Sequence, residues 1–341
     1  MKPLPPDARI LAIAVARIGD TLLVTPALAA LKALAPAGRL TCLAHPKRLE
    51  ILQHLPFIDR LGPITKQRAP WLGRLSGKRY DLAVVWGKDA PLIRYALRAA
   101  HQVIAFRQED ASINESLAAC VEWPATEGHA VDHRLSLLAP LAPPAAGRRL
   151  RYAASAAETS WARGWLRQAC GRDGVLPVCM QTASFPTKAY RDWPEASFRE
   201  LGERLLARDP RIVLVLLGDR GDRERAARIA AALGPRALCA AGDFTLRQSA
   251  AMLSLAGLYV GVDTGITHVA GALGLPMVAL YHCAHPGRYL APLEHPAPLE
   301  VIEQPLPPGG CSTAAGMDAI SVDRVWDAAQ RVLAQAASRD S

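Results

Sequence analysis

The sequence predicts an α/β fold made of two doubly wound, Rossmann-like domains, each built on a parallel sheet. Two observations support this. Apolar runs of strand length alternate with amphipathic, helix-length segments along the whole chain. These runs are continuously apolar rather than alternating, which is typical of parallel strands buried on both faces. The expected strands are 10–15, 40–44, 82–86, 103–106, 178–181, 212–217, 258–262 and 277–281.

Helical patterns occupy the segments between these strands. Pro26 and Pro194 each lie at the start of such a segment, in the first turn, where the missing N–H costs no hydrogen bond. Gly234 and Pro235 end another. The expected helices are 26–34, 153–170, 194–207, 223–233 and 322–337.

Chain length and proline positions predict two domains. A chain of 341 residues is too long for one simple core. Three prolines and a glycine between residues 140 and 147 mark a break. We expect an N-terminal domain over 1–150, a second domain over 151–325, and a C-terminal helix with a loose tail over 326–341.

Composition excludes several classes of protein. Half of the residues are hydrophobic and 21% are charged, which is typical of a folded globular protein rather than a disordered one. No apolar stretch reaches the roughly 18 residues of a membrane-spanning helix. The N-terminal apolar run ends at Arg17 and Asp20 without a cleavage site, so no signal peptide is expected. Seven scattered cysteines, never in Cys-x-x-Cys spacing, disfavour a disulfide framework or zinc ribbon and predict a cytoplasmic protein.

Positive charge is concentrated in the N-terminal part of the chain. The net charge is +9, and residues 1–150 carry 20 basic and 12 acidic side chains, a net charge of +8. Such a surface attracts a polyanion or an anionic membrane surface. A solvated surface in an arginine-rich protein, with 33 Arg against 7 Lys, accounts for the same numbers. Composition leaves both explanations open.

The loop after the first strand carries a candidate catalytic base. Ligands of open parallel sheets bind beyond the carboxyl ends of the strands, where this loop lies. We expect Asp20 to take a proton there from an attacking hydroxyl. Arg17, Gly19 and Thr21 are the candidate acceptor-binding residues, with Gly19 permitting a tight turn. The alternative is that Asp20 is a simple helix N-cap. A Gly-x-Gly-x-x-Gly motif is missing, which argues against the usual dinucleotide-binding fold.

The loop after strand 258–262 has the composition of a diphosphate site. It reads Asp-Thr-Gly-Ile-Thr-His and opens a helix. Backbone N–H groups at a helix start, together with threonine hydroxyls, suit a bound diphosphate. A structural role for the histidine is the alternative. The candidate donor-binding residues here are Asp263, Thr264, Gly265 and His268.

Two further loops complete the candidate donor site. The loop after strand 178–181 combines small hydroxyl residues with two cations that attract phosphate. The loop after strand 212–217 ends in Asp222, a carboxylate placed to hold ribose hydroxyls. The candidates in the first of these loops are Thr182, Ser184, Lys188 and Arg191.

Histidines, cysteines and tryptophans elsewhere in the sequence do not form the usual pattern of a metal site or a sugar platform. His282, Cys283 and His285 are too closely spaced for a standard zinc site, so no metal is expected. His129 and His133 have helical spacing, but no Glu follows the first of them as in zinc proteases, and we expect capping or solvent-facing roles. Core or domain-interface packing, rather than a sugar platform, is expected for Trp71, Trp86, Trp123, Trp161 and Trp165.

The order of these motifs resembles glycosyltransferase family 9, the bacterial heptosyltransferases of the lipopolysaccharide inner core. The resemblance extends over about residues 9–335. It rests on Ile-Gly-Asp followed by Thr-Pro-Ala-Leu near the N-terminus, on a Trp-Pro loop, and on Asp-Thr-Gly-x-x-His at 263–268. The family usually has Lys two residues before the Trp-Pro pair, where this chain has Arg191 with Lys188 nearby. Which of the two cations contacts the phosphates is left open.

The resemblance implies a fold, a reaction and its partners. The fold is GT-B, with two Rossmann-like domains facing a cleft, the acceptor on the N-terminal domain and the ADP-sugar on the C-terminal one. The reaction is an inverting, metal-independent transfer of a heptose, or a related sugar, to a lipopolysaccharide core hydroxyl. Asp20 is the base, and Asp263, Thr264 and His268 hold the donor. No cofactor is implied, since the ADP-sugar is a substrate.

The implied partners are the nucleotide-sugar donor and an anionic lipopolysaccharide core acceptor, without nucleic acid. Peripheral contact at the inner face of the inner membrane follows from the basic N-terminal domain. Two other functions stay open from the sequence. A sugar-nucleotide epimerase on the same fold needs no acceptor. A basic nucleic-acid-binding protein fits the net charge, although interleaved aromatics and a zinc-finger pattern are missing.

Overall fold

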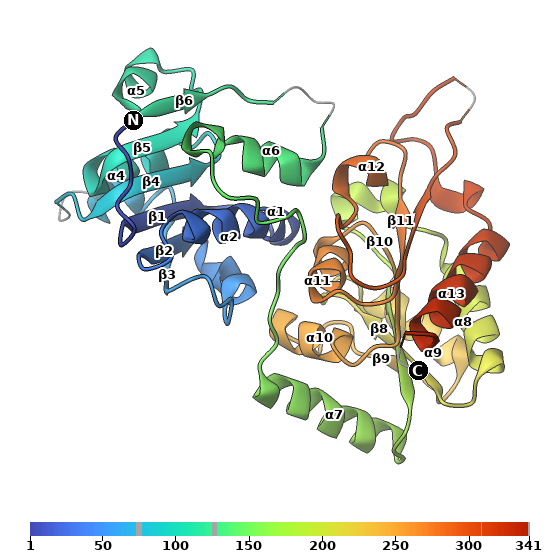
Figure 1. Ribbon diagram of the computed structural model, residues 1–341. Helices are drawn as coiled ribbons and strands as arrows, with labels where there is room; N and C mark the ends of the chain where they lie inside the picture. The colour runs from blue at the N-terminus through green and yellow to red at the C-terminus, as the bar shows by residue number, and fades with distance from the viewer. Residues whose placement is uncertain (73–76, 125–127, 308, 340–341) are drawn as a thin grey trace. The chain divides into compact units, whose positions relative to one another are not determined.

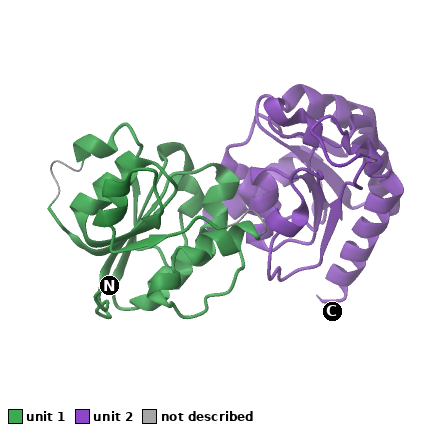
Figure 2. Ribbon diagram, turned by 90° about the horizontal axis from the view of Figure 1, so that it is seen from above, with its two compact units in different colours: residues 1–153 green, residues 154–341 purple. Residues whose placement is uncertain are grey.

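Two parallel sheets form the framework of the protein. The structure is a computed structural model that describes residues 1–72, 77–124, 128–307 and 309–339 (Figure 1). The chain divides into two compact units, residues 1–153 and 154–341 (Figure 2). Each unit contains one six-stranded sheet in which every strand pairs in parallel with its neighbours. The predicted α/β class with two Rossmann-like domains is confirmed.

The sheet of unit 1 has the strand order β3-β2-β1-β4-β5-β6. The chain runs outward from β1 through β2 to β3 and then returns to the other side of β1 with β4. The switch point, where ligands bind in open α/β sheets, therefore lies between the carboxyl ends of β1 and β4. The strands are β1 (Arg9–Ala14), β2 (Arg39–Ala44), β3 (Arg60–Pro63), β4 (Tyr80–Trp86), β5 (Ala100–Phe106) and β6 (Ala119–Val121).

Helices cover both faces of this sheet, which explains the unbroken apolar character of its central strands. Ile10 of β1 belongs to a core cluster with Leu28 of α2. Leu11, the next residue, belongs to a separate cluster with Ile93 of α4 on the opposite face. The helices are α1 (Ile18–Leu23), α2 (Thr25–Leu34), α3 (Ala69–Leu72), α4 (Ala90–Ala99), α5 (Ala111–Ser116) and α6 (Ala130–Ser136), with 3-10 turns η1 (Pro46–Leu52) and η2 (Ala139–Leu141).

The sheet of unit 2 has the order β12-β11-β10-β7-β8-β9, and its switch point lies between β7 and β10. Its strands are β7 (Leu176–Gln181), β8 (Ile212–Leu217), β9 (Ala237–Cys239), β10 (Leu258–Val262), β11 (Met277–Tyr281) and β12 (Leu299–Glu303). Its helices are α7 (Ala156–Cys170), α8 (Glu195–Arg208), α9 (Arg223–Leu233), α10 (Leu246–Leu253), α11 (Gly265–Leu273), α12 (Gly287–Leu290) and α13 (Val322–Ala337), with turns η3 (Pro186–Arg191) and η4 (Met317–Ala319).

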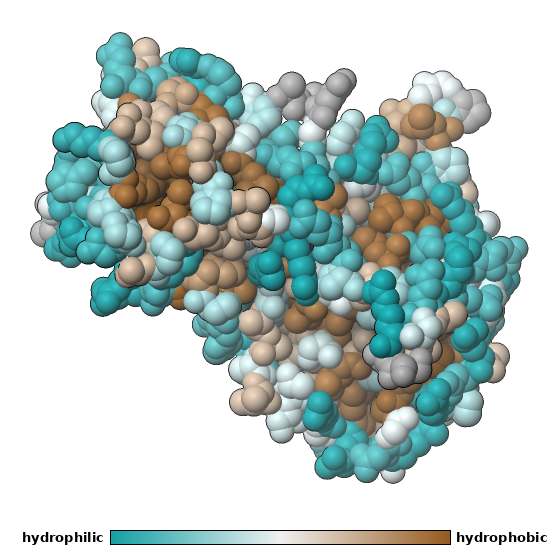
Figure 3. All heavy atoms as spheres, in the orientation of Figure 1, coloured by the Kyte–Doolittle hydropathy of each residue, from teal (hydrophilic) through white to brown (hydrophobic). Residues whose placement is uncertain are grey.

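Helix α13 closes one face of the sheet of unit 2. Its buried residues include Val325, Ala328 and Val332, which join the core cluster of β7, β8, β10 and β11. The visible outer surface over α13 is mainly hydrophilic (Figure 3). Among the residues that the structure describes, no helix is both long and apolar enough to cross a bilayer.

Tryptophan packing only partly follows the prediction. Trp86 is buried, and the half-buried Trp161 and Trp165 pack edge-to-face on Phe244 at ring-centroid distances of 5.1 and 4.9 Å, as expected for packing residues. The prediction is wrong for Trp71 and Trp123, which are 68% and 43% exposed. These two side chains therefore do not belong to the buried core.

One disulfide forms, although the scattered cysteines disfavour a disulfide framework. Cys283, in the loop after β11, is bonded to Cys311, which follows β12, with their Cα atoms 5.8 Å apart. Adjacent parallel strands bring these two loops to the same sheet edge, a proximity that cysteine spacing in the sequence does not show. The other five cysteines are free thiols.

Candidate functional site

A cavity of about 270 Å³ opens at the switch point of unit 1. Its walls come from the ends of β1, β4 and β5 and from the loops that follow them. Asp20 and Arg134 supply its charged groups, together with Arg17, and Trp86 and Trp123 supply aromatic surface. The predicted base therefore lies where open α/β sheets bind ligands.

Asp20 lies inside helix α1 and is not its N-cap. The N-cap position is Arg17, and Asp20 falls in the first turn. The Asp20 side chain is 43% exposed, and Oδ1 accepts a hydrogen bond from Arg134 Nη2 at 3.1 Å. The alternative of a simple cap is wrong, because this carboxylate is directed to a cation from another helix.

Arg134 reaches Asp20 from α6 and is itself held in place. Its side chain is only 18% exposed, and its backbone carbonyl accepts a hydrogen bond from Trp86 Nε1 at 2.9 Å. Sequence analysis missed Arg134 because 114 residues separate it from Asp20. No local motif marks the pair, since only the fold brings α1, β4 and α6 together.

The candidate acceptor-binding residues around Asp20 differ in their exposure. Arg17 is exposed. Thr21 is fully buried, and its hydroxyl donates to the Arg17 carbonyl at 2.8 Å, so it braces the loop and offers no group to a ligand. Gly19 has no positive φ and lies within α1, so the expected tight glycine turn is absent.

In unit 2, the predicted diphosphate loop is the start of helix α11. Thr264 is the N-cap residue, and its N–H donates to Thr267 Oγ1 at 3.3 Å. Asp263 and His268 are both nearly buried, with Asp263 Oδ1 3.5 Å from His268 Nε2. Gly265 is the first helical residue, so its backbone lies in the positively polarised first turn.

The Arg191 side chain is buried and contacts Asp263. Its guanidinium forms a buried ion pair with the Asp263 carboxylate and also donates to the Asp263 carbonyl. Burial lowers the pKa of Arg191. Lys188, in the same 3-10 turn, is half-buried. The sequence leaves open whether Lys188 or Arg191 contacts the phosphates. In the structure, Arg191 binds and positions Asp263.

The neighbouring candidate residues differ in whether their polar side-chain atoms already have hydrogen-bond partners within the protein. The Ser184 hydroxyl donates a hydrogen bond to the Lys188 carbonyl at 2.7 Å. This hydroxyl proton is therefore used within the loop and is not directed to a nucleotide-sugar. The Thr182 hydroxyl is buried and has no partner within the described residues. Asp222 accepts hydrogen bonds from Asp219 N at 3.0 Å and Gln181 Nε2 at 3.2 Å. Burial, more than any other cause, raises the pKa of Asp222 to about 6.

The loop after β11 packs on this cluster through Tyr190. The Tyr190 hydroxyl lies 3.1 Å from His285 Nε2, and its ring meets the His282 ring edge-to-face at 4.9 Å. Burial, together with nearby cations, lowers the pKa of His285 to about 4. His282 Nε2 lies 2.8 Å from the Ala315 carbonyl, and Nδ1 accepts from Ala284 N at 3.0 Å. Both ring nitrogens of His282 and the sulfur of Cys283 therefore hold this loop in its conformation.

The histidine pair in unit 1 has a capping member, as expected. His129 is the N-cap residue of α6, and its Nδ1 accepts from Val131 N at 3.1 Å. This cap helps to set the start of the helix that carries Arg134.

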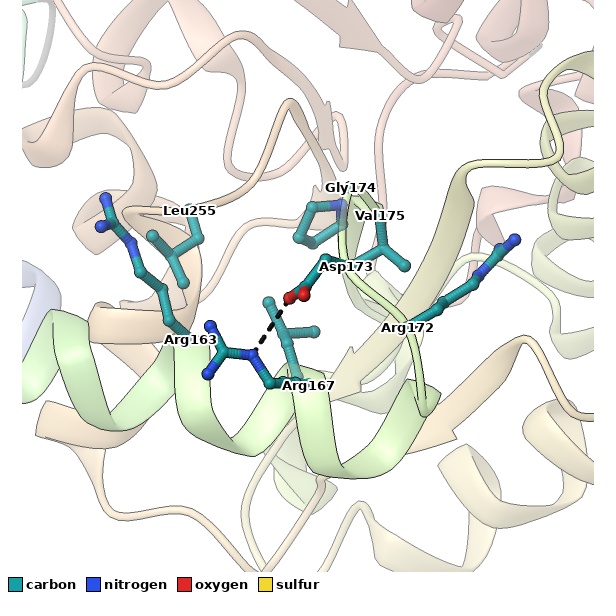
Figure 4. A pocket seen from close by; sticks show the side chains of 9 residues that line it. Arg163, Arg167, Arg172, Asp173, Gly174, Val175 and Leu255 are labelled. Atoms are coloured by element: carbon teal, nitrogen blue, oxygen red, sulfur yellow. Dashed lines mark hydrogen bonds and ion pairs between the residues drawn. The ribbon is translucent and has the colours of Figure 1, made fainter.

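Unit 2 has a cavity of about 260 Å³ beside the start of β7, at the amino ends of the strands (Figure 4). Arg163 and Arg167 of α7 extend toward it, and Arg167 Nε donates to Asp173 at 3.0 Å. None of the predicted site residues lines this cavity. It is separate from the candidate donor site at the carboxyl edge.

Comparisons with known proteins agree with this architecture. Lipopolysaccharide heptosyltransferase 3 of Escherichia coli is 25% identical over 279 residues, which cover 77% of this chain and 80% of that protein. The crystal structure of a family 9 glycosyltransferase from Veillonella parvula has a TM-score of 0.82 at 19% identity, covering 97% of this chain and 99% of that one. E. coli ADP-heptose lipopolysaccharide heptosyltransferase II has a TM-score of 0.78 at 22% identity, with coverages of 96% and 99%. The predicted GT-B type is confirmed.

A family model covers most of the chain. Residues 74–299 match the model described as glycosyltransferase family 9 (heptosyltransferase). The match includes the donor-site candidates of unit 2 and begins after Asp20. It identifies an enzyme that transfers a sugar, and it favours neither the epimerase nor the nucleic-acid-binding alternative. The chain belongs to glycosyltransferase family 9, the heptosyltransferase family.

Proposed function

We propose that this enzyme transfers a heptose, or a related sugar, from an ADP-sugar to a hydroxyl of a lipopolysaccharide core acceptor. The observation that carries the proposal is the Asp20–Arg134 pair, a half-exposed carboxylate at the switch point of unit 1. A carboxylate so placed is accessible to an acceptor hydroxyl. The names of the curated relatives, which are lipopolysaccharide heptosyltransferases, support the choice of donor and acceptor.

The proposed reaction is a single displacement with inversion. Asp20 removes the proton from the acceptor hydroxyl while that oxygen forms a bond to the anomeric carbon of the donor. The bond from this carbon to the ADP oxygen breaks, and ADP leaves with the electron pair. Arg134 keeps the Asp20 carboxylate in position through their hydrogen bond. Attack opposite to the leaving group inverts the anomeric configuration.

The donor site of the proposal is the carboxyl edge of unit 2. The start of α11 offers backbone N–H groups and positive potential to the diphosphate, with the Thr264 hydroxyl beside them. We assign Lys188 as the cation for the diphosphate, because Arg191 is bound to Asp263. Asp222 accepts hydrogen bonds from ribose hydroxyls. These groups neutralise the leaving diphosphate, so the proposal requires no metal and no cofactor.

The basic N-terminal part of the chain acts on the acceptor side. A net charge of +8 over residues 1–150 draws an anionic core acceptor toward the Asp20 cavity. The same charge supports peripheral contact with the inner face of the inner membrane, where a cytoplasmic enzyme meets such an acceptor.

The test of this function is the variant Asp20→Asn, which keeps the shape of the side chain and removes the base. Transfer from ADP-heptose to a deacylated inner-core acceptor is expected to fall by about 10²–10⁴-fold. Calorimetric ADP affinity should stay unchanged. Asp7→Asn, an exposed carboxylate outside the cavity, is the matched control. Full transfer activity of Asp20→Asn would remove Asp20 from the mechanism.

A further inference from the structure

A second cavity lies beside the Asp20 cavity on the same sheet edge. It encloses about 470 Å³, within the usual range for small-molecule sites. Its walls follow the ends of β4, β5 and β6, whereas those of the Asp20 cavity follow β1, β4 and β5. Trp123 lines both cavities. A ligand that reaches Asp20 can therefore extend across Trp123 into the second cavity.

Trp123 is held in place and is partly open. Its ring packs edge-to-face against Phe106, with the centroids 4.7 Å apart and the planes at 62°. Lys88 Nζ lies over the ring, 5.0 Å from its centroid. The residue remains 43% exposed although an apolar ring gains free energy by burial. The fixed indole thus forms an aromatic wall that the structure leaves partly uncovered.

The charges of the second cavity largely cancel. Asp110 pairs with Arg94 at 2.8 Å, and Glu122 forms an ion pair with Arg107. Lys88 and Glu109, which also line the cavity, have opposite charges. The cavity is thus rich in hydrogen-bonding groups and poor in net charge. This combination suits a hydroxyl-rich ligand better than a highly charged phosphate.

We propose that this cavity binds a second sugar ring of the acceptor, stacked on Trp123. The C–H face of a sugar ring is apolar and meets the electron-rich face of an indole favourably. The ring hydroxyls exchange hydrogen bonds with the Arg107–Glu122 pair, while the first ring presents its hydroxyl to Asp20. This inference rests on the proposed function and adds to it that the enzyme selects acceptors with at least two sugar rings.

The kinetic test compares Trp123→Ala and Trp123→Phe with the wild type on inner-core saccharides of one and two rings. For the two-ring saccharide, KM should rise about tenfold in Trp123→Ala and about threefold in Trp123→Phe, which keeps an aromatic ring. KM for the one-ring saccharide should rise less than KM for the two-ring saccharide, because Trp123 also lines the Asp20 cavity, and KM for ADP-heptose should not change. Trp71→Ala, which removes an exposed tryptophan outside both cavities, is the control. Equal KM changes for both saccharides, or none, would overturn the proposal.

A binding measurement separates this inference from the proposed reaction. Saturation-transfer NMR on Asp20→Asn, in which turnover is removed, should show contact with the protons of the second ring. Combining that variant with Trp123→Ala should abolish this signal. A failure of transfer by the wild type, with these signals intact, would count against the reaction alone. A signal that persists without Trp123, or no binding of the two-ring saccharide at all, would refute the subsite.

Discussion

At the residue scale, two neighbouring cations of one turn have different surroundings. Arg191 and Lys188 look interchangeable in the sequence, because both are cations in a hydroxyl-rich loop. In the structure the planar guanidinium of Arg191 contacts both the carboxylate and the carbonyl of Asp263, a pairing that a lysine ammonium cannot reproduce. The distinction depends on burial and orientation, which sequence spacing does not contain.

This division of roles predicts opposite outcomes for two variants. Arg191→Met leaves the buried Asp263 without its ion-pair partner, which should lower the free energy of unfolding by about 3–5 kcal/mol. Lys188→Met should weaken ADP binding about tenfold and lower the melting temperature less than Arg191→Met does. Thermal unfolding and calorimetric titration with ADP measure the two effects. The assignment fails if Lys188→Met binds ADP with wild-type affinity.

Asp222 predicts a pH dependence of stability. Its pKa is about 6 in the folded protein, above the value of about 3.9 for an unfolded chain. The folded state thus favours the protonated carboxyl, and this contribution to stability is lost as pH rises from about 4 to about 6. Asp222→Asn does not titrate, so its melting temperature relative to wild type should rise over that range and level off above it. A constant difference between pH 4 and 7 would contradict the assigned pKa.

At the scale of elements, the buried central strands are predicted from the sequence, whereas the edge strands are not. Strands β8, β10 and β11 have the expected bounds, because they are continuously apolar and fully buried. The four edge strands β3, β6, β9 and β12 were not predicted. Strand β3 is Arg-Leu-Gly-Pro and largely exposed, so it depends on pairing with β2 rather than on an apolar pattern of its own. Sequence patterns also miss contacts between distant residues. The loop motif predicts Asp20 as a site residue, but its partner Arg134 is found only from the packing of α6 in the structure.

The disulfide gives a prediction for the segment after β12. A link between Cys283 and Cys311, 28 residues apart, restricts the unfolded chain and contributes about 3–4 kcal/mol in the chain-entropy model. Dithiothreitol should therefore lower the unfolding temperature of the wild type. Cys311→Ser should unfold at that lower temperature with or without the reductant. Cys170→Ser, which alters a free thiol, is the control. An unchanged unfolding temperature in reductant would show that this link contributes no stability.

At the scale of the whole molecule, the two units differ in charge although they share one architecture. Each has a six-stranded parallel sheet with a switch point at its carboxyl edge. Yet residues 1–150 carry nearly all of the net charge of +9. Fold class follows from apolar periodicity and is the same for both halves. Charge is independent of that pattern, and under the proposed function its asymmetry corresponds to an anionic acceptor for unit 1 and a single nucleotide-sugar for unit 2.

This asymmetry predicts membrane binding that depends on salt. The enzyme should sediment with vesicles containing anionic phospholipid at about 0.1 M salt, where charges act over about 10 Å, and should be released near 1 M, where they act over about 3 Å. Purely zwitterionic vesicles are the control and should bind little at either concentration, because an electrostatic attraction needs anionic lipid. Binding that is equally strong at both salt concentrations would show that the contact is apolar. The exposed Trp71 would then be the first residue to replace, since an apolar contact requires such a side chain at the surface.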